Sequence, residues 1–405
     1  MNPPAFADFF SLREKGRSSF ELDPQRDAEL YLDLDGSWTE IEKVLTNSTY
    51  SEAPKLLIEG DYGTGKSHLL RKIEAFCKNA KPPTYLPIYL ELSGFGRRSD
   101  YLDVHKLVMR HILNCTRKSL QTYVHNSENI KDKISSILGD CGVAADDVVD
   151  TLLLLAAPSI GDTDSEIVRT AKKWLTGHKL LARERRMINV QVNLAECCKP
   201  PELVGLCKFF AEIERRESKR TVLLLIDETE AFTAVVDPDA KASIGHGMRA
   251  LFDPSNKSCG IFLGLNMPGA RMSNHPILRR DVSSRMKNKK ILLQPLNTEV
   301  RRGQFMTQLW PKLSTIDPKE DSRVGPFLLT PDAQELIQKR LRDLHDALDT
   351  NSESSGTAPT QRELLAVLSL IGAIAREEQV RPIDRSSIMK WLELAETQET
   401  QETTP

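Results

Sequence analysis

The stretch LLIEGDYGTGKSHLL, from Leu56 to Leu70, places three glycines within six residues directly after an apolar run. Two structures produce such a pattern: a glycine-rich surface turn, or a backbone cradle for phosphate groups. Its central part, GDYGTGKS at residues 60–67, matches GxxxxGK[ST] at every fixed position. A buried-strand candidate at residues 55–59 precedes it, and a helix candidate follows it. This strand–loop–helix context favours the phosphate cradle.

Each part of this phosphate loop (residues 60–67) has a physical role. Glycine lets the backbone turn its N–H groups toward an anion without Cβ clashes, and the helix that follows directs its positive end at the same place. Lys66 can reach the outer phosphates and Ser67 can bind Mg²⁺. ATP and Mg²⁺ are the predicted cofactors. The residues expected to contact the nucleotide here are Gly60, Asp61, Tyr62, Gly63, Thr64, Gly65, Lys66, Ser67 and His68.

A second motif, LLLIDE at residues 223–228, is an apolar strand candidate that ends in two acids. Its uninterrupted apolar run is typical of a parallel strand buried on both faces. Asp227 is expected to hold Mg²⁺ through water, and Glu228 to polarise an attacking water. Taken alone, the pair could be a solvated strand end; the phosphate loop upstream favours the catalytic role. Asn266 ends a further strand and is expected to orient that water, although a lone Asn there is more often a turn former.

Strand candidates alternate with helical segments along the chain, which predicts an α/β fold with a parallel sheet sandwiched by helices. A helical insertion is expected to split the sheet, and a helical lid domain to follow it. The predicted parts are a helical lead-in (1–50), the first part of the core (51–99), the insertion (100–215), the second part of the core (216–295), the lid (296–395) and a disordered tail (396–405).

The order of GDYGTGKS, LLLIDE, LGLN, RRDVSSRM and PTQRELLAVLSLIG resembles that of AAA+ ATPases of the origin-recognition and Cdc6-like branch, over about residues 38–395. The resemblance implies that Arg285 is an arginine finger acting on a neighbouring subunit's site, with Arg279 and Arg280 as alternatives. It also implies that Arg362 contacts the γ-phosphate of its own subunit. The sequence DYGTGKSHLL and the segment 168–190 are similar to the corresponding parts of ATP-binding proteins of bacterial BREX-type phage-defence systems.

Charge and cysteine content limit the class of protein. The 55 Lys and Arg nearly balance the 57 Asp and Glu, so no global attraction to nucleic acid or membrane is expected. Seven cysteines without a CxxC pair favour a reducing, cytoplasmic setting, and no apolar run is long enough for a membrane helix. Three basic runs, at residues 183–186, 215–220 and 287–290, are either solvated faces or nucleic-acid contacts. Without interleaved aromatic residues they argue against single-strand binding.

The two motifs predict binding and hydrolysis of ATP with Mg²⁺. The resemblance implies an AAA+ ATPase that forms a homo-oligomer through shared sites. It would assemble or remodel a DNA-associated complex in anti-phage defence, with a helicase or nuclease as a candidate partner. The alternative is a slow nucleotide-dependent switch or scaffold that recruits such an effector. Glu228 favours hydrolysis, because a pure switch does not need it. A small-molecule kinase is disfavoured by the Asp-Glu pair and by the helical C-terminal domain.

Overall fold

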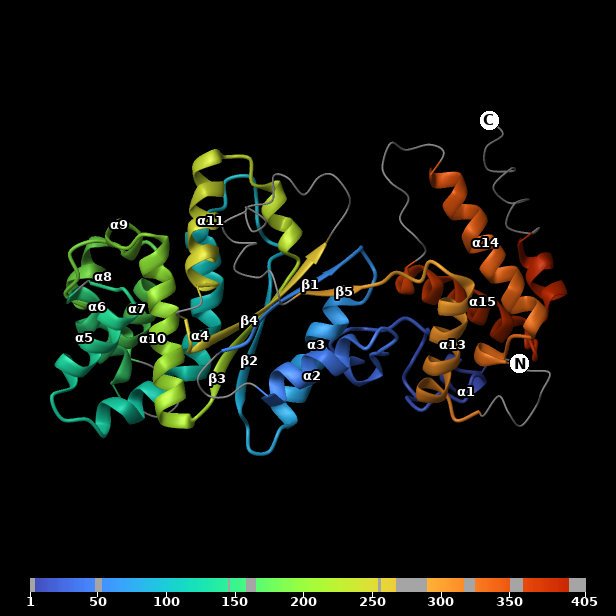
Figure 1. Ribbon diagram of the computed structural model, residues 1–405, viewed down its shortest axis with the longest axis horizontal. Coiled ribbons are helices and arrows are strands. Elements are labelled where there is room, and N and C mark those ends of the chain that lie inside the picture. Colours follow the sequence, from blue (N-terminus) through green and yellow to red (C-terminus); the bar gives the residue numbers. More distant parts are fainter. Residues whose placement is uncertain are drawn as a thin grey trace.

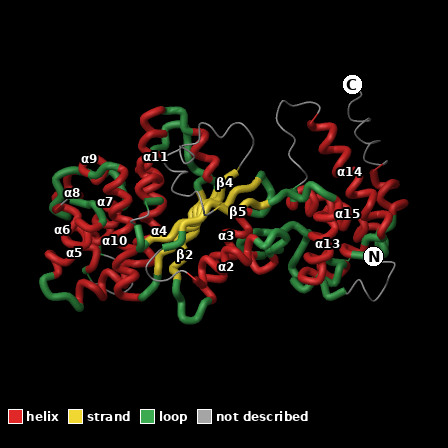
Figure 2. The backbone as a smooth tube through the Cα atoms, viewed as in Figure 1, coloured by secondary structure: helices red, strands yellow, loops and turns green. Residues whose placement is uncertain are grey.

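The computed structural model describes residues 4–47, 53–144, 146–157, 165–253, 256–266, 290–316, 325–349 and 360–392. Figure 1 shows a central sheet with a large group of helices at one end and a second helical group at the other, where the N-terminus also lies. Figure 2 shows the same separation by element type, with the strands gathered between the two helical groups. No helix in these ranges is long and apolar enough to cross a membrane.

The described strands form one five-stranded sheet in which every pair is parallel. This confirms the predicted α/β class. The register pairs Gly60 with Asn266 and Glu91 with Asp227, so the carboxyl ends of four strands lie at one edge of the sheet. The strand order is β2-β3-β4-β1-β5, with β1 at Lys55–Gly60, β2 at Tyr85–Glu91, β3 at Thr221–Asp227, β4 at Cys259–Asn266 and β5 at Lys290–Leu293.

Strand β3 is buried along its whole length, and its side chains alternate between two hydrophobic cores. Leu223 and Leu225 pack with helices α2 (Ser37–Asn47) and α3 (Lys66–Asn79). Leu224 and Ile226 belong to the core on the opposite face, which is covered by α4 (Tyr101–His125), α10 (Pro200–Ser218) and α11 (Pro238–Leu251). A strand covered on both faces needs apolar residues at every position, which explains the run VLLLI.

The predicted insertion is helical, and it extends the core of the sheet rather than forming a core of its own. Its buried Trp174 and Leu152 belong to the same hydrophobic cluster as β3. Gly177 follows the last turn of α7 (Glu166–Leu175) with φ +79, and its N–H bonds to the carbonyl of Trp174, as a helix-ending glycine does. The helices are α5 (Ile130–Asp140), α6 (Asp146–Ala156), α7 (Glu166–Leu175), α8 (Ala182–Met187) and α9 (Leu194–Cys197).

The C-terminal helices and the start of the chain share a separate core. Phe20 packs edge-to-face on Phe10 and on Phe327, with ring centroids 4.8 and 4.9 Å apart. The predicted lead-in is therefore divided: α1 (Phe6–Phe9) and Phe20 complete the C-terminal domain, whereas α2 packs on the sheet. The C-terminal helices are α13 (Glu299–Leu313), η6 (Pro326–Leu328), α14 (Pro331–Asp349) and α15 (Gln361–Glu378). The predicted tail, 396–405, lies outside the described residues.

Candidate nucleotide-binding site

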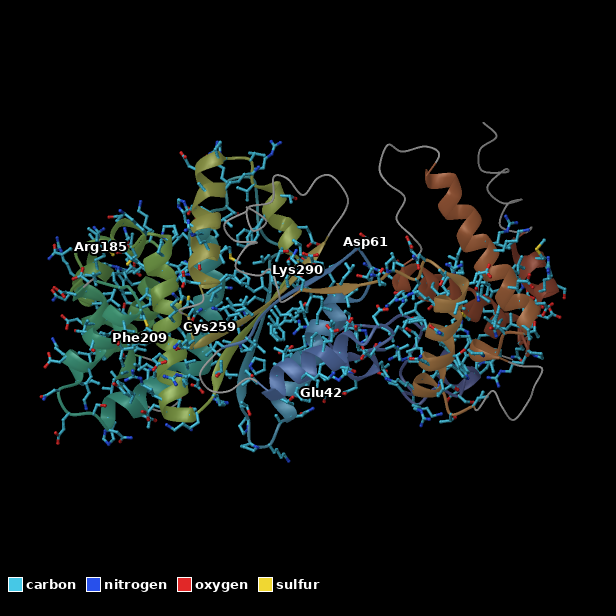
Figure 3. The ribbon with its side chains drawn as sticks, in the orientation of Figure 1. Glu42, Asp61, Arg185, Phe209, Cys259 and Lys290 are labelled. Carbon is cyan, nitrogen blue, oxygen red and sulfur yellow. The ribbon has the colours of Figure 1, made fainter. Side chains whose placement is uncertain are left out.

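The phosphate loop connects β1 to α3 through a turn that requires its glycines. Gly63 and Gly65 have φ of +74 and +95, values that other residues adopt only with strain. A Cβ at Gly60 would lie 2.6 Å from Oγ1 of Thr64, which donates 2.8 Å to the carbonyl of Asp61. Contacts within the loop therefore hold its conformation. The loop lies at the edge of the sheet that faces the C-terminal helices, where Figure 3 labels Asp61.

The ammonium group of Lys66 is folded back into this loop. Its Nζ donates to the carbonyls of Gly60 at 3.0 Å and Asp61 at 2.7 Å, and the residue is only 7% exposed. Burial lowers the pKa of Lys66, while the nearby charges of Glu230, Asp227 and Asp61 act in the opposite direction. A buried cation that bonds to loop carbonyls is well placed to exchange them for phosphate oxygens.

Asp227, at the carboxyl end of β3, is 3% exposed and is held through both of its oxygens. Its Oδ1 accepts a hydrogen bond from the Glu228 N–H at 2.9 Å, and its Oδ2 accepts one from the phenol of Tyr89 at 2.5 Å. The guanidinium of Arg71 lies 3.3 Å from the centre of the Tyr89 ring. Burial and the Asp227 carboxylate raise the pKa of Tyr89, so the phenol stays protonated and donates. Tyr89 and Arg71 were not predicted.

Glu228 adopts a left-handed backbone conformation, with φ 56 and ψ 39. For a residue with a Cβ this costs about 1–2 kcal/mol, and such strain is found where surrounding structure enforces it, often at functional sites. Burial raises the pKa of Glu228, and the charges of Glu91, Asp227 and Glu230 add to the effect. A carboxylate with a raised pKa is a stronger base than an ordinary glutamate.

The N-terminus of α15 lies against the phosphate loop. Thr360 caps this helix, and a Cβ added to Gly63 would lie 2.6 Å from the Thr360 Cβ. Arg362 donates from Nη1 to the phenol oxygen of Tyr62 at 2.8 Å. The structure thus places Arg362 beside the loop. Its contact with a γ-phosphate stays a prediction.

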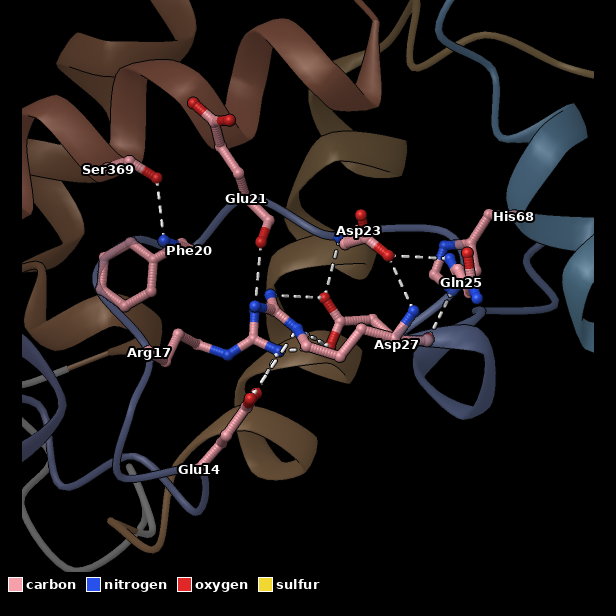
Figure 4. A network of polar contacts seen from close by, with 10 residues as sticks. Glu14, Arg17, Phe20, Glu21, Asp23, Gln25, Asp27, His68 and Ser369 are labelled. Atoms are coloured by element: carbon pink, nitrogen blue, oxygen red, sulfur yellow. Dashed lines mark hydrogen bonds and ion pairs between the residues drawn. The ribbon is translucent and has the colours of Figure 1, made fainter.

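The side chain of His68 has a different partner from the one expected. Its Nε2 lies 2.6 Å from the carbonyl oxygen of Asp27, in the N-terminal segment. Asp27 is itself paired with Arg17 and Arg26 in a buried network that Figure 4 shows next to α15. The imidazole is therefore directed away from the phosphate loop, because the turn of α3 carries residue 68 round toward that segment. Its contact with a nucleotide stays a prediction.

Ser67 and Asp227 are the side chains predicted to bind Mg²⁺. Within the described ranges, no three or more His, Cys, Asp or Glu side chains are grouped so as to hold a metal ion. Such a group is not required, since Mg²⁺ retains waters and phosphate oxygens and needs only one or two protein carboxylates. A hydroxyl at the start of α3 and one oriented carboxylate therefore fit this ion.

Some predicted residues fall outside what is described. Asn266 ends β4 beside Gly60, but the description does not extend to its side chain. The three finger candidates, Arg279, Arg280 and Arg285, lie outside the described residues.

The basic runs differ in how their charge is balanced. Arg215 and Arg216 pair with Glu212, Arg220 pairs with Glu214, and Lys290 pairs with Glu59. By contrast, none of the three arginines at 183, 185 and 186 forms an ion pair within the described part of the chain. Figure 3 places Arg185 at the far end of the insertion, remote from Asp61. Residues 287–289 of the third run lie outside the described residues.

Comparisons with known proteins identify no family for this chain. A scan against protein-family models found no match. A search of curated proteins also found none. The function is therefore inferred from the residues of the site.

Proposed function

We propose that this protein is a Mg²⁺-dependent ATP hydrolase of the AAA+ type. The observation that carries the proposal is the meeting of three elements at one sheet edge. They are the glycine-rich loop with Lys66 buried in it, the carboxylate of Asp227 held at the end of β3, and the N-terminus of α15 with Arg362. This is the constellation that binding and cleaving a nucleoside triphosphate requires.

Binding is assigned to the loop and the start of α3. Backbone N–H groups of the glycine-rich turn and the positive end of the helix attract the phosphates. Lys66 would give up its contacts with the carbonyls of Gly60 and Asp61 and bond to the outer phosphates. Ser67 and Asp227 would hold Mg²⁺, which neutralises charge between the last two phosphates.

Hydrolysis is assigned to Glu228, with help from Arg362. The carboxylate of Glu228 would accept a proton from the attacking water, and its raised pKa suits that role. Arg362 would contact the γ-phosphate once the guanidinium leaves Tyr62. A cation at that position stabilises charge that develops in the transition state.

The hydrolytic assignment is tested with Glu228→Gln, which keeps size and hydrogen bonding but removes the charge. Turnover should fall about 10²-fold or more, with ATP still bound. Glu217→Gln, near the end of α10 and away from the loop, removes the same charge and should leave turnover near the wild-type rate. If Glu228→Gln hydrolyses ATP at the wild-type rate, the base is another group.

For the biological role we propose a cytoplasmic, DNA-associated assembly in bacterial anti-phage defence, with a helicase or nuclease partner. Self-association would complete each site with a neighbour's arginine, Arg285 or one of its alternatives. Mixing two inactive proteins, Arg285→Ala and Lys66→Ala, should then restore some hydrolysis, because a mixed interface joins an intact loop to an intact finger. Mixed oligomers without activity would exclude Arg285. A protein that stays monomeric with ATP and DNA would favour the switch.

A further inference from the structure

Tyr89 is a polar aromatic residue on a strand that otherwise supplies core packing. It lies on β2, two positions before Glu91, which is the register partner of Asp227. Its side chain is on the α3 side of the sheet, packed against the cluster that contains Leu70 and Leu225. From there the phenol reaches Oδ2 of Asp227 at 2.5 Å, a short distance typical of a hydroxyl donating to a carboxylate.

The ring of Tyr89 is fixed from the other side by α3. Arg71 stacks on it with the guanidinium carbon 3.3 Å from the ring centre, and its Nη1 donates 2.7 Å to Glu74 on the same helix. Stacking of a flat guanidinium on an aromatic face is a stabilising contact. Arg71 lies one helical turn after Ser67. Tyr89 thus connects α3, which carries Ser67, to the carboxylate of Asp227. Ser67 and Asp227 are the two side chains expected to bind the same Mg²⁺ ion.

We propose that Tyr89, held by Arg71, is a positioning residue for Mg²⁺: it fixes the orientation of the Asp227 carboxylate and its separation from Ser67. The inference rests on the proposed function. With Oδ2 bonded to Tyr89 and Oδ1 to the Glu228 N–H, the carboxylate cannot rotate freely. Each oxygen keeps a lone pair for a water bound to the ion. Partners of this kind typically govern metal affinity by about 10- to 100-fold.

The competing explanation is that Tyr89 merely packs, and that its hydroxyl needs an acceptor because it is partly buried. The two explanations differ in what Mg²⁺ does. A packing residue affects nucleotide binding equally with and without the ion, whereas a positioning residue affects only the part of the affinity that depends on Mg²⁺. Tyr85 supplies a matched control, since it lies on the same face of β2 and its phenol donates to the Leu45 carbonyl, away from Asp227.

The test measures binding of a fluorescent ADP analogue to the full chain, in excess EDTA and across a Mg²⁺ titration. In Tyr89→Phe the ring still packs against Arg71 but the hydroxyl is gone. The Mg²⁺ midpoint should rise by about 10- to 100-fold, with unchanged affinity in EDTA. Tyr85→Phe should keep the wild-type midpoint. Arg71→Lys keeps the charge without the flat stacking surface and should raise the midpoint by a smaller factor, which provides a test if Tyr89→Phe is poorly folded.

A double-variant cycle with Asp227→Asn tests whether Tyr89 acts on Mg²⁺ affinity through Asp227. Once Asp227 is changed, removing the Tyr89 hydroxyl should produce little further shift of the Mg²⁺ midpoint. A wild-type midpoint in Tyr89→Phe overturns the inference, as does an equal loss of affinity with and without Mg²⁺. If the wild-type protein binds no nucleotide in either condition, the proposed function itself fails and the inference falls with it.

Discussion

Arg362 donates a hydrogen bond to the phenol of Tyr62 across 2.8 Å, although 300 residues separate them in the sequence. The contact joins the phosphate loop to the first turn of α15, where Thr360 and Gln361 also face the glycines of the loop. Tyr62 is 63% exposed, so the contact contributes little to the stability of the fold. The contact holds a guanidinium at the edge of the phosphate loop.

Arg362→Ala is therefore expected to weaken ATP binding more than ADP binding. Only ATP presents a γ-phosphate to the guanidinium, and a charge-assisted hydrogen bond contributes about 1.5–3 kcal/mol, or roughly 10- to 100-fold in affinity. Fluorescent competition with a non-hydrolysable ATP analogue and with ADP measures the two affinities. Arg362→Lys should retain part of the preference. Equal losses for both nucleotides would show that Arg362 does not bind the γ-phosphate.

Gly63→Ala is expected to damage both stability and nucleotide binding. The added Cβ meets Thr360 at 2.6 Å, and φ +74 is unfavourable for alanine. Together these effects should lower the free energy of unfolding by about 1–3 kcal/mol. Gly96→Ala is the control, because a Cβ there has nothing within 4 Å. Denaturant titration compares the variants, and equal stability of Gly63→Ala and wild type would contradict the described contact with α15.

Glu212 should stabilise the fold in a pH-dependent manner. Burial acts to raise its pKa, but hydrogen bonds from Arg215, Ser258 and Arg216 outweigh it and lower the pKa to about 2. A lowered pKa contributes stability above the ordinary carboxylate range and loses it as the pH falls toward 2.

The corresponding variant is Glu212→Gln, with Glu217→Gln as the control on the same helix. At pH 7 Glu212→Gln should lose up to about 3 kcal/mol of unfolding free energy, and the loss should shrink between about pH 5 and pH 2. Urea titrations at several pH values measure it. A deficit that does not change with pH would mean that the ion pairs of Glu212 are not its source.

The insertion is expected to contribute the DNA contacts of the proposed assembly. His178 lies among cations from two helices: its pKa is lowered by burial and then by Lys106, Arg110 and Lys173. The neighbouring run 183–186 has no ion pair for its arginines within the described residues. Neutral substitutions Lys179→Gln, Arg183→Gln and Arg186→Gln, combined, should weaken binding to a DNA duplex.

The salt dependence of that binding, measured by fluorescence anisotropy, distinguishes a DNA contact from a solvated face. Each phosphate contact that is lost should reduce the slope of log K against log salt by about one. A matched triple variant, Lys118→Gln with Lys133→Gln and Lys257→Gln, removes the same charge from other exposed sites. If both triple variants bind DNA with the same slope, the basic run is only a solvated face.

Local patterns predicted the parts of the site that lie within one segment. The phosphate loop and the Asp227–Glu228 pair each follow an apolar strand. A motif of eight or fewer residues is therefore sufficient to place each of them at the end of a strand. Strand β5 was not predicted, because it has only four residues and begins within a basic run. Its exposed Lys290 and Leu292 alternate with buried Ile291 and Leu293, a pattern too short to identify a strand.

Contacts between distant segments could not be predicted in the same way. The phenylalanines at 6, 10 and 20 pack with Trp310 and Phe327, which lie about 300 residues away in the sequence. Local patterns in residues 1–50 do not indicate this division of the lead-in. Tyr89 and Arg71 belong to no motif, and only the parallel register of β2 and β3 brings them to Asp227. The contact of the His68 imidazole with the Asp27 carbonyl also joins distant segments, and the position of His68 after Ser67 does not indicate it.

The most direct test of the account is MgATP binding by Lys66→Ala, measured by isothermal titration calorimetry. Lys66 is the cation buried within the phosphate loop, and Lys78→Ala, on the exposed side of the same helix, is the control. The account predicts that wild type and Lys78→Ala bind MgATP, and that Lys66→Ala, with a wild-type unfolding transition, loses at least about 10-fold in affinity, as loss of a charge-assisted hydrogen bond requires. Wild-type affinity in a folded Lys66→Ala protein would contradict the assignment of this loop as a phosphate site.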